Sequence, residues 1–181
     1  SKKLVRREFR PLTREELAPE LFRSFDRFQI VEKCWRKVEG QWVVKDVVFT
    51  ERWGEEDYRF LCQCLQNTVA TGGQVWGAFL EGRLKGFASV EGPLIGSPKQ
   101  YADLTSIHVS ADARGHGLGR QLFQRAEETG RRLGAKALYI SAHSSVESQA
   151  FYKAMGCVEA TEYIPAHVEQ EPCDCQLECP L

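Results

Sequence analysis

The chain has 181 residues, of which 43% are hydrophobic and 27% charged, a composition typical of one globular domain with a full core. The net charge of −1 gives no electrostatic reason to expect binding to nucleic acid or to an anionic membrane. No apolar run approaches the roughly 18 residues that span a bilayer, and the basic N-terminus lacks the apolar core of a secretory signal, so we expect a cytoplasmic protein with one domain over residues 1–181.

The N-terminal segment is expected to hold a strand and then a helix. Residues 4–9 favour a short strand. Thr13 and Glu16 have the spacing of a capping box, which predicts a helix that runs towards Phe25. Pro19 interrupts this helix, because proline lacks a backbone N–H and its ring clashes with the preceding turn.

Two hairpins and a helix should follow. Residues 34–48 predict an extra hairpin around Glu39-Gly40-Gln41, with Trp35 and Trp42 placed to face one another across its arms. Residues 55–71 have the apolar spacing of an amphipathic helix. Residues 75–90 predict a second hairpin, whose turn is Glu81-Gly82-Arg83.

Strands and helices alternate in the rest of the chain. The expected elements are a strand at 101–109, a helix at 119–133, a strand at 137–141, a helix from a capping box at Ser144 and Glu147 to Gly156, and strands at 158–164 and 174–180. Hairpins combined with crossover helices indicate an α/β fold: a central, twisted, mixed β-sheet flanked by helices.

The seven cysteines do not suggest a metal site. An odd number without a secretory signal indicates reduced thiols. Cys173, Cys175 and Cys179 lie near His167, but metal ligands usually come as pairs two to four residues apart. We therefore expect three thiols on one buried strand face and no metal; a metal-linked protein is the minor alternative.

The most informative motif is Arg114-Gly115-His116-Gly117-Leu118-Gly119, between a predicted strand and a predicted helix. Glycine lets the backbone approach a ligand, and the free amides of a helix N-terminus favour a phosphate. A dinucleotide fingerprint needs an acidic residue about 20 residues further on, which is absent, and a Walker loop needs a Gly-Lys-Ser or Gly-Lys-Thr sequence. The loop alone is also compatible with a tight turn.

A second motif, Phe151-Tyr152-Lys153-Ala154-Met155-Gly156, follows downstream. Together with the glycine loop and Ile107-His108-Val109 before it, this motif resembles the GNAT superfamily of N-acetyltransferases. The resemblance covers residues 75–160 closely, as a cofactor-binding core, and residues 4–17 loosely. It implies a GNAT-like fold in which a bulge separates the loop-bearing strand from the next one. It also implies acetyl-CoA as the co-substrate. The implied cofactor-binding residues are Ile107, His108, Val109, Arg114, Gly115, His116, Gly117, Leu118, Gly119, Arg120, Ser145, Ser148, Phe151 and Tyr152.

The resemblance also implies catalytic roles. Tyr152 matches the tyrosine that protonates the departing thiolate, which a phenol with a pKa near 10 can do. Ser145 stands where many members have a cofactor-binding asparagine, and Thr105 where many have a glutamate base. Asp103, on the expected strand face of Thr105, or Glu91 on the neighbouring strand is then the base, acting through water.

Two histidines are further candidates for the base. His108 has a suitable ordinary pKa but is expected on the opposite strand face, and His143 ends the next strand. For both, a structural role is favoured.

The function implied is direct transfer of an acetyl group, within a ternary complex, from acetyl-CoA to the primary amine of an acceptor, first of all a small molecule. The alternatives are acetylation of a protein N-terminus or lysine, and an acyl-CoA-binding regulatory module without turnover. The residues of the extra hairpin serve packing or form a wall of the acceptor pocket. A homodimer is compatible with the family analogy.

Overall fold

A seven-stranded mixed sheet forms the centre of the molecule, in the order β1-β4-β5-β6-β7-β9-β8. The structure is a computed structural model that describes residues 5–181. The strands are β1 (Arg7–Pro11), β4 (Gln74–Leu80), β5 (Arg83–Val90), β6 (Tyr101–Val109), β7 (Ala137–Ala142), β8 (Val158–Glu159) and β9 (Cys175–Pro180). Only β6 and β7 pair in parallel within this sheet, and the other neighbours are antiparallel. The predicted α/β fold around a mixed sheet is confirmed.

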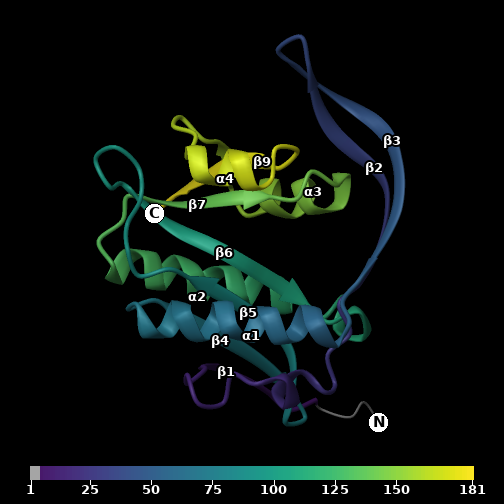
Figure 1. Ribbon diagram of the computed structural model, residues 1–181, viewed down its shortest axis with the longest axis vertical. Helices are drawn as coiled ribbons and strands as arrows, with labels where there is room; N and C mark the ends of the chain where they lie inside the picture. The colour runs from purple at the N-terminus through teal and green to yellow at the C-terminus, as the bar shows by residue number, and fades with distance from the viewer. Residues whose placement is uncertain (1–4) are drawn as a thin grey trace.

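Helices cover both faces of the sheet (Figure 1). The helices are α1 (Glu55–Ala70), α2 (Leu118–Arg132), α3 (Val146–Ala154) and the short α4 (Pro165–Gln170). Successive residues of a strand point to opposite faces of the sheet, so neighbours on β5 enter different core clusters. Phe87 packs with α1, whereas Ala88 packs with α2 and α3. A third cluster, which contains Tyr101 and Tyr139, lies under the start of α4.

The extra hairpin exists and is longer than predicted. Its strands are β2 (Phe28–Val38) and β3 (Gln41–Arg52), which form a separate two-stranded sheet. Glu39 and Gly40 both have positive φ and make a two-residue turn, so Gln41 already pairs with Val38. In this register Trp35 pairs with Val44 and Trp42 with Lys37. The expectation that the two tryptophans face one another is therefore wrong.

The predicted N-terminal helix does not form. Both capping-box hydrogen bonds are present, with the Thr13 amide 2.7 Å from a Glu16 carboxylate oxygen and the Glu16 amide 3.3 Å from the Thr13 hydroxyl. Only a 3₁₀ turn, Pro19–Phe22, follows. Pro19 falls where a helix begun at Thr13 would need its second turn, and proline cannot supply that hydrogen bond. Part of the predicted first strand, residue 4, lies outside the described residues.

Two C-terminal predictions also need correction. The strand predicted at 158–164 is only Val158–Glu159, and the chain then enters α4 with Pro165 at its first turn, a favoured position for proline. The cap of α3 is Ser145 rather than Ser144, because the Ser145 hydroxyl accepts the Ser148 amide at 3.2 Å.

Candidate active site

Strands β6 and β7 separate shortly after they meet. They pair only through Tyr101–Ala137, Ala102–Leu138 and Asp103–Tyr139. Beyond Asp103, β6 continues to Val109, and among residues 5–181 β5 is the one strand that pairs with it there. One backbone edge of residues 104–109 is therefore free of a neighbouring strand, and an extended ligand with amide groups can pair with such an edge.

A bulge lies where the strands separate. Ser89 of β5 pairs with Ser106, whereas Val90 pairs with Leu104, so Thr105 is the extra residue on β6. The Thr105 and Ser89 hydroxyls share a hydrogen bond of 2.8 Å. An extra residue reverses the alternation of faces beyond it.

His108 shows the consequence of the bulge. Its ring lies 5.4 Å from that of Phe87, on the sheet face that also holds Asp103 and Thr105. The expectation that His108 lies on the opposite face from these two residues is therefore wrong.

The glycine loop has the geometry expected of an anion-binding turn. Gly115 has φ 84° and Gly117 has φ 75°, a left-handed conformation that glycine adopts without strain. Gly117 is the N-cap of α2, with no side-chain cap, and the first amides of a helix have no intrahelical partner. No atom lies within 4 Å of a Cβ built at either glycine, so a ligand can approach this backbone.

The side chains of the loop differ in their surroundings. The Arg114 guanidinium donates to the Phe28 carbonyl and so ties the loop to β2. His116 and Arg120 are exposed, whereas Leu118 is buried in the core, so only its backbone can meet a ligand. Gly119 allows α2 to approach α3, since a Cβ there would lie 3.1 Å from the Phe151 ring.

Tyr152 lies in the core beneath the separated strands. It packs on Phe151, and its side chain is largely buried with α2 residues such as Leu122. Burial raises the pKa of Tyr152 well above its ordinary value; the neighbouring Cys157 and Asp174 add to this effect and Arg27 opposes it. The phenol is therefore protonated at neutral pH, as a proton donor must be. Within residues 5–181 its hydroxyl makes no hydrogen bond.

A chain of polar contacts connects the ends of the separated strands. The Arg27 Nε–H donates to His108 Nδ1 at 3.2 Å, and the Arg27 guanidinium lies 3.5 Å from Glu51. His143, after β7, lies 3.3 Å from the other Glu51 oxygen. Burial, together with Arg27 and His143, lowers the pKa of His108 to about 3, so this imidazole is neutral. Arg27 and Glu51 could not be recognised as site residues from the sequence, because their contacts depend on how the hairpin is placed.

The hairpin β2–β3 bridges the loops that follow β6 and β7. Besides the Arg114 contact near its start, the Trp35 amide donates to the Ser144 carbonyl at 2.8 Å. The Arg36 guanidinium donates to the Ser144 hydroxyl at 2.6 Å. Figure 1 shows the hairpin passing along this side of the molecule towards α3. This position supports the interpretation of the hairpin as a wall of the site.

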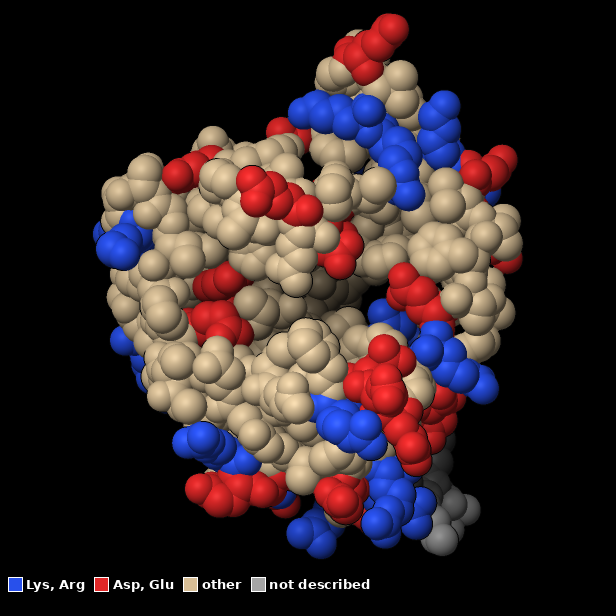
Figure 2. All heavy atoms as spheres, viewed as in Figure 1, with Lys and Arg blue, Asp and Glu red and all other residues tan. Residues whose placement is uncertain are grey.

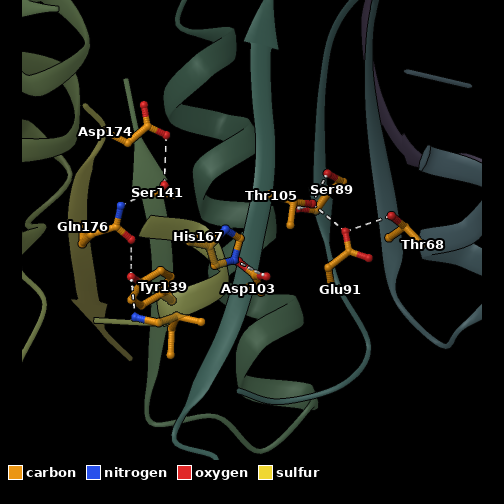
Figure 3. Close-up of polar contacts among 11 residues, drawn as sticks. Thr68, Ser89, Glu91, Asp103, Thr105, Tyr139, Ser141, His167, Asp174 and Gln176 are labelled. Atoms are coloured by element: carbon orange, nitrogen blue, oxygen red, sulfur yellow. Dashed lines mark hydrogen bonds and ion pairs between the residues drawn. The ribbon is translucent and has the colours of Figure 1, made fainter. Parts of the chain in front are cut away.

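Polar side chains gather on the sheet face between α1 and α4 (Figure 3). The Glu91 carboxylate accepts hydrogen bonds from the Thr105 hydroxyl at 2.5 Å and the Thr68 hydroxyl at 2.9 Å. Asp103 instead pairs with His167 of α4, with 2.8 Å between Oδ2 and Nε2. Figure 2 shows a hollow in this face with acidic side chains around it. His167 was missed as a site residue because α4 was not predicted, although Pro165 marks its start.

Ser145 and Ser148 lie at the start of α3, with Ser145 fully buried as the cap. Ile107 and Val109 face the α2 side of β6 and pack against the main core. The glycine loop, β6 and α3 thus bring most of the predicted cofactor residues to one region, whereas His108 faces the α1 side.

The C-terminal cysteines are not arranged as predicted. Cys175 and Cys179 are buried in β9, but Cys173 precedes the strand and is exposed, so the three thiols do not share a buried face. Within residues 5–181, no group of three or more His, Cys, Asp or Glu side chains could hold a metal ion. The same residues form no helix that is long and apolar enough to cross a membrane.

Comparison with known proteins agrees with this geometry. The model of the acetyltransferase (GNAT) family matches residues 28–157. This protein belongs to the GNAT acetyltransferase family. The match covers the hairpin, the separated strands, the glycine loop and α3, and it confirms the predicted family. No curated protein matches the sequence.

Solved structures show the same fold over almost the whole chain. Nourseothricin acetyltransferase is 16% identical with a TM-score of 0.68, covering 96% of this chain and 98% of its own. A Bacillus anthracis protein described as a streptothricin acetyltransferase, with acetyl coenzyme A bound, is 15% identical with a TM-score of 0.70, covering 97% and 99%. The PaiA N-acetyltransferase of Thermoplasma acidophilum, in complex with coenzyme A, is 16% identical with a TM-score of 0.60, covering 97% and 99%. The prediction of acetyl-CoA as co-substrate is confirmed at the level of the family.

Proposed function

We propose that this GNAT family member transfers an acetyl group from acetyl-CoA directly to a primary amine of a small molecule, within a ternary complex. The observation that carries the proposal is the separation of β6 and β7 beside the glycine loop, with Tyr152 beneath the opening. This arrangement offers a free strand edge for the amides of pantetheine and free helix amides for the pyrophosphate.

Residues 75–160 form the proposed cofactor-binding core. Residues 107–109 line the pantetheine arm, and the backbone from Gly115 to Arg120 receives the pyrophosphate. His116 and Arg120 are exposed cations or donors at that position. Ser145 and Ser148 lie at the start of α3, beside the same opening, and Phe151 supports Tyr152.

The reaction requires a neutral amine, because an alkyl ammonium has an ordinary pKa near 10.4 and no free electron pair. The amine nitrogen attacks the thioester carbonyl, the C–S bond breaks, and Tyr152 gives its proton to the leaving sulfur. Glu91 and Asp103 supply negative charge on the opposite side of the opening, where a cationic amine would arrive. In our proposal these charges attract the amine, and its deprotonation takes place beside them through an intervening group or water.

The small-molecule acceptor is supported by two observations. The hollow between α1 and the C-terminal strands is bounded by the hairpin, which limits the space for a protein chain (Figure 2). Two of the similar structures are named for nourseothricin and streptothricin rather than for a protein.

Calorimetric titration with acetyl-CoA tests the cofactor site. Gly117→Asp and Gly117→Asn form a matched pair, because both side chains tolerate a positive φ and only Asp adds a negative charge. We expect wild type to bind and Gly117→Asp to bind at least about tenfold more weakly than Gly117→Asn, since the phosphates and the carboxylate repel each other. Equal affinities of the two variants would place the pyrophosphate elsewhere.

The amine acceptor is then sought by mass spectrometry of reactions with acetyl-CoA and four primary amines: spermidine, tyramine, lysine and kanamycin. A mass increase of one acetyl group on any of them supports the enzyme. Binding of acetyl-CoA without transfer to any amine would favour the alternative, an acyl-CoA-binding module without turnover.

A further inference from the structure

The pair His167–Asp103 lies beside the separation of β6 and β7. Asp103 is the last β6 residue paired with β7, and Thr105, the bulged residue, follows two positions later. Figure 3 shows His167 and Asp103 together, next to the Glu91–Thr105 pair on the same face of β6. The pair therefore lies at the point from which the two strands diverge.

Asp103 itself is poorly placed to take a proton from a substrate. Its side chain is only 10% exposed, and its Oδ2 is occupied by His167 Nε2 at 2.8 Å. Its Oδ1 is fully buried and, within residues 5–181, has no hydrogen-bond partner. One Asp103 oxygen is thus buried, and the other is bound to the imidazole.

His167 has the opposite properties. Its side chain is 20% exposed, so a ligand in the hollow can reach the ring. The ring stacks on Tyr139 at 5.5 Å, which fixes its plane. Because Nε2 donates its proton to Asp103, the free electron pair of the neutral imidazole is on Nδ1, which has no hydrogen-bond partner among the described residues. A carboxylate that holds one nitrogen of an imidazole and stabilises its cation is the arrangement of an acid–base pair.

Glu91 is less suited to the same task. Its Oε2 accepts two hydroxyl hydrogen bonds, from Thr105 and Thr68. That oxygen is therefore already engaged by two side chains of the protein. Glu91 can attract a cationic amine, but an imidazole is better matched to proton transfer near neutral pH.

We propose that His167 is the general base of the acetyl transfer, with Asp103 as the residue that positions its imidazole. The inference rests on the proposed function. His167 Nδ1 takes a proton from the ammonium of the acceptor and passes it to water. The amine then forms the C–N bond, the C–S bond breaks, and Tyr152 protonates the sulfur. The second N–H proton, lost as the amide forms, restores the Tyr152 phenol, so one proton is released for each turnover.

The charges around His167 favour its protonated form. Asp103 on β6 contributes most to a raised pKa, burial opposes it, and Asp174 before β9 and Glu91 at the end of β5 add to it. Tyr139 on β7 faces the ring as a neutral phenol, since burial raises its pKa to about 12. On and next to its own helix, Glu169 and Glu171 are exposed. The share of His167 in its neutral, basic form therefore increases as the pH rises.

The test compares wild type with His167→Gln and Asp103→Asn, using acetyl-CoA and whichever of the four primary amines wild type acetylates best. Glu169→Gln is the matched control, because it removes a charge from the same short helix at an exposed position. The measurements are kcat/KM for the amine from pH 6 to 10, the Kd of acetyl-CoA, and thermal unfolding.

We expect kcat/KM of His167→Gln to fall about 100-fold or more at pH 7, which is the usual contribution of a general base. The Kd of acetyl-CoA should not change in this variant, and kcat/KM of the control Glu169→Gln should match wild type. The loss should shrink towards pH 10, where the free amine becomes abundant. In Asp103→Asn the rising limb of the pH profile should move to lower pH, because the carboxylate that raises the His167 pKa is gone. A purely structural role would leave the position of that limb unchanged.

The outcomes separate the two proposals. A wild type that acetylates none of the amines overturns both the proposed function and this inference. An active wild type whose kcat/KM at pH 7 and position of the rising limb are both unchanged in His167→Gln overturns only the inference. If His167→Gln unfolds, the Asp103→Asn profile decides: an unshifted limb overturns the inference, and a shifted limb supports it.

Discussion

At the scale of single residues, Tyr152 combines a ring that packs in the core with a hydroxyl that makes no hydrogen bond among the described residues. Tyr152→Phe keeps the ring, so the free energy of unfolding should change by less than about 1 kcal/mol, the scale of one hydrogen bond. Loss of the proton donor should lower kcat about 100-fold or more. Steady-state kinetics, thermal unfolding and calorimetry with acetyl-CoA measure the three quantities.

The same substitution at Tyr163 serves as the control, because it removes a hydroxyl from an exposed side chain. Its kcat should match wild type. If Tyr152→Phe keeps the wild-type kcat while the Kd of acetyl-CoA rises, then Tyr152 binds the cofactor without protonating the sulfur.

The low pKa of His108 predicts how the stability of the folded protein depends on pH. In the unfolded chain its pKa is near 6.5, whereas burial, Arg27 and His143 lower it to about 3 in the folded protein. Between these values the unfolded state binds more protons, so stability falls as the pH drops from 6.5 towards 3. His108→Gln should therefore lose less stability between pH 7 and pH 4.5 than wild type does.

Urea unfolding at the two pH values measures that difference. Packing lost in the variant lowers stability at both pH values and cancels in the comparison. Equal losses in wild type and His108→Gln would mean that His108 is protonated, or accessible to protons, in the folded state.

At the scale of elements, α4 depends on contacts rather than on its own sequence. Six residues are too few for a stable isolated helix. The Ile164 amide donates to the Tyr139 hydroxyl at 3.1 Å, and that hydroxyl donates to Gln176.

Tyr139→Phe removes both bonds, at a cost of about 1–3 kcal/mol. Hydrogen exchange should therefore speed up in α4 and remain unchanged in α1, which is the internal control. Uniform acceleration in both helices would show that the loss is global.

The elements around the glycine loop could be predicted from the sequence because local signals agree there. Apolar spacing, glycine at the turn and Gly134 at the helix end all indicate one strand-loop-helix unit. The helix predicted in the N-terminal segment was wrong although its capping box forms, because Pro19 prevents a helix from continuing beyond the first turn.

The family resemblance implied a bulge, but its position at Thr105 could not be predicted, since one extra residue leaves the composition of a strand unchanged. That position moves His108 to the other face. The pairs Arg27–Glu51 and His167–Asp103 likewise depend on the placement of β3 and α4. These contacts join segments far apart in the chain, which no local pattern encodes.

At the scale of the whole molecule, the separation of β6 and β7 leaves an edge in the middle of the sheet rather than at its border. Backbone groups on such an edge are satisfied by water until a ligand replaces it. The hairpin β2–β3 joins the two loops beyond this edge, so cofactor and acceptor would meet in a region bounded by both halves of the sheet.

Binding of acetyl-CoA should consequently stabilise the folded protein as a whole. A ligand at 100 times its Kd adds about 2.7 kcal/mol to the free energy of unfolding, which for a domain of this size raises Tm by about 5–10 °C. Thermal unfolding with and without acetyl-CoA measures the shift, and Gly117→Asp should show a smaller one than Gly117→Asn. Hydrogen exchange should slow in residues 104–109, where the free edge becomes paired. A Tm shift without slower exchange there would place the ligand outside the separation of β6 and β7.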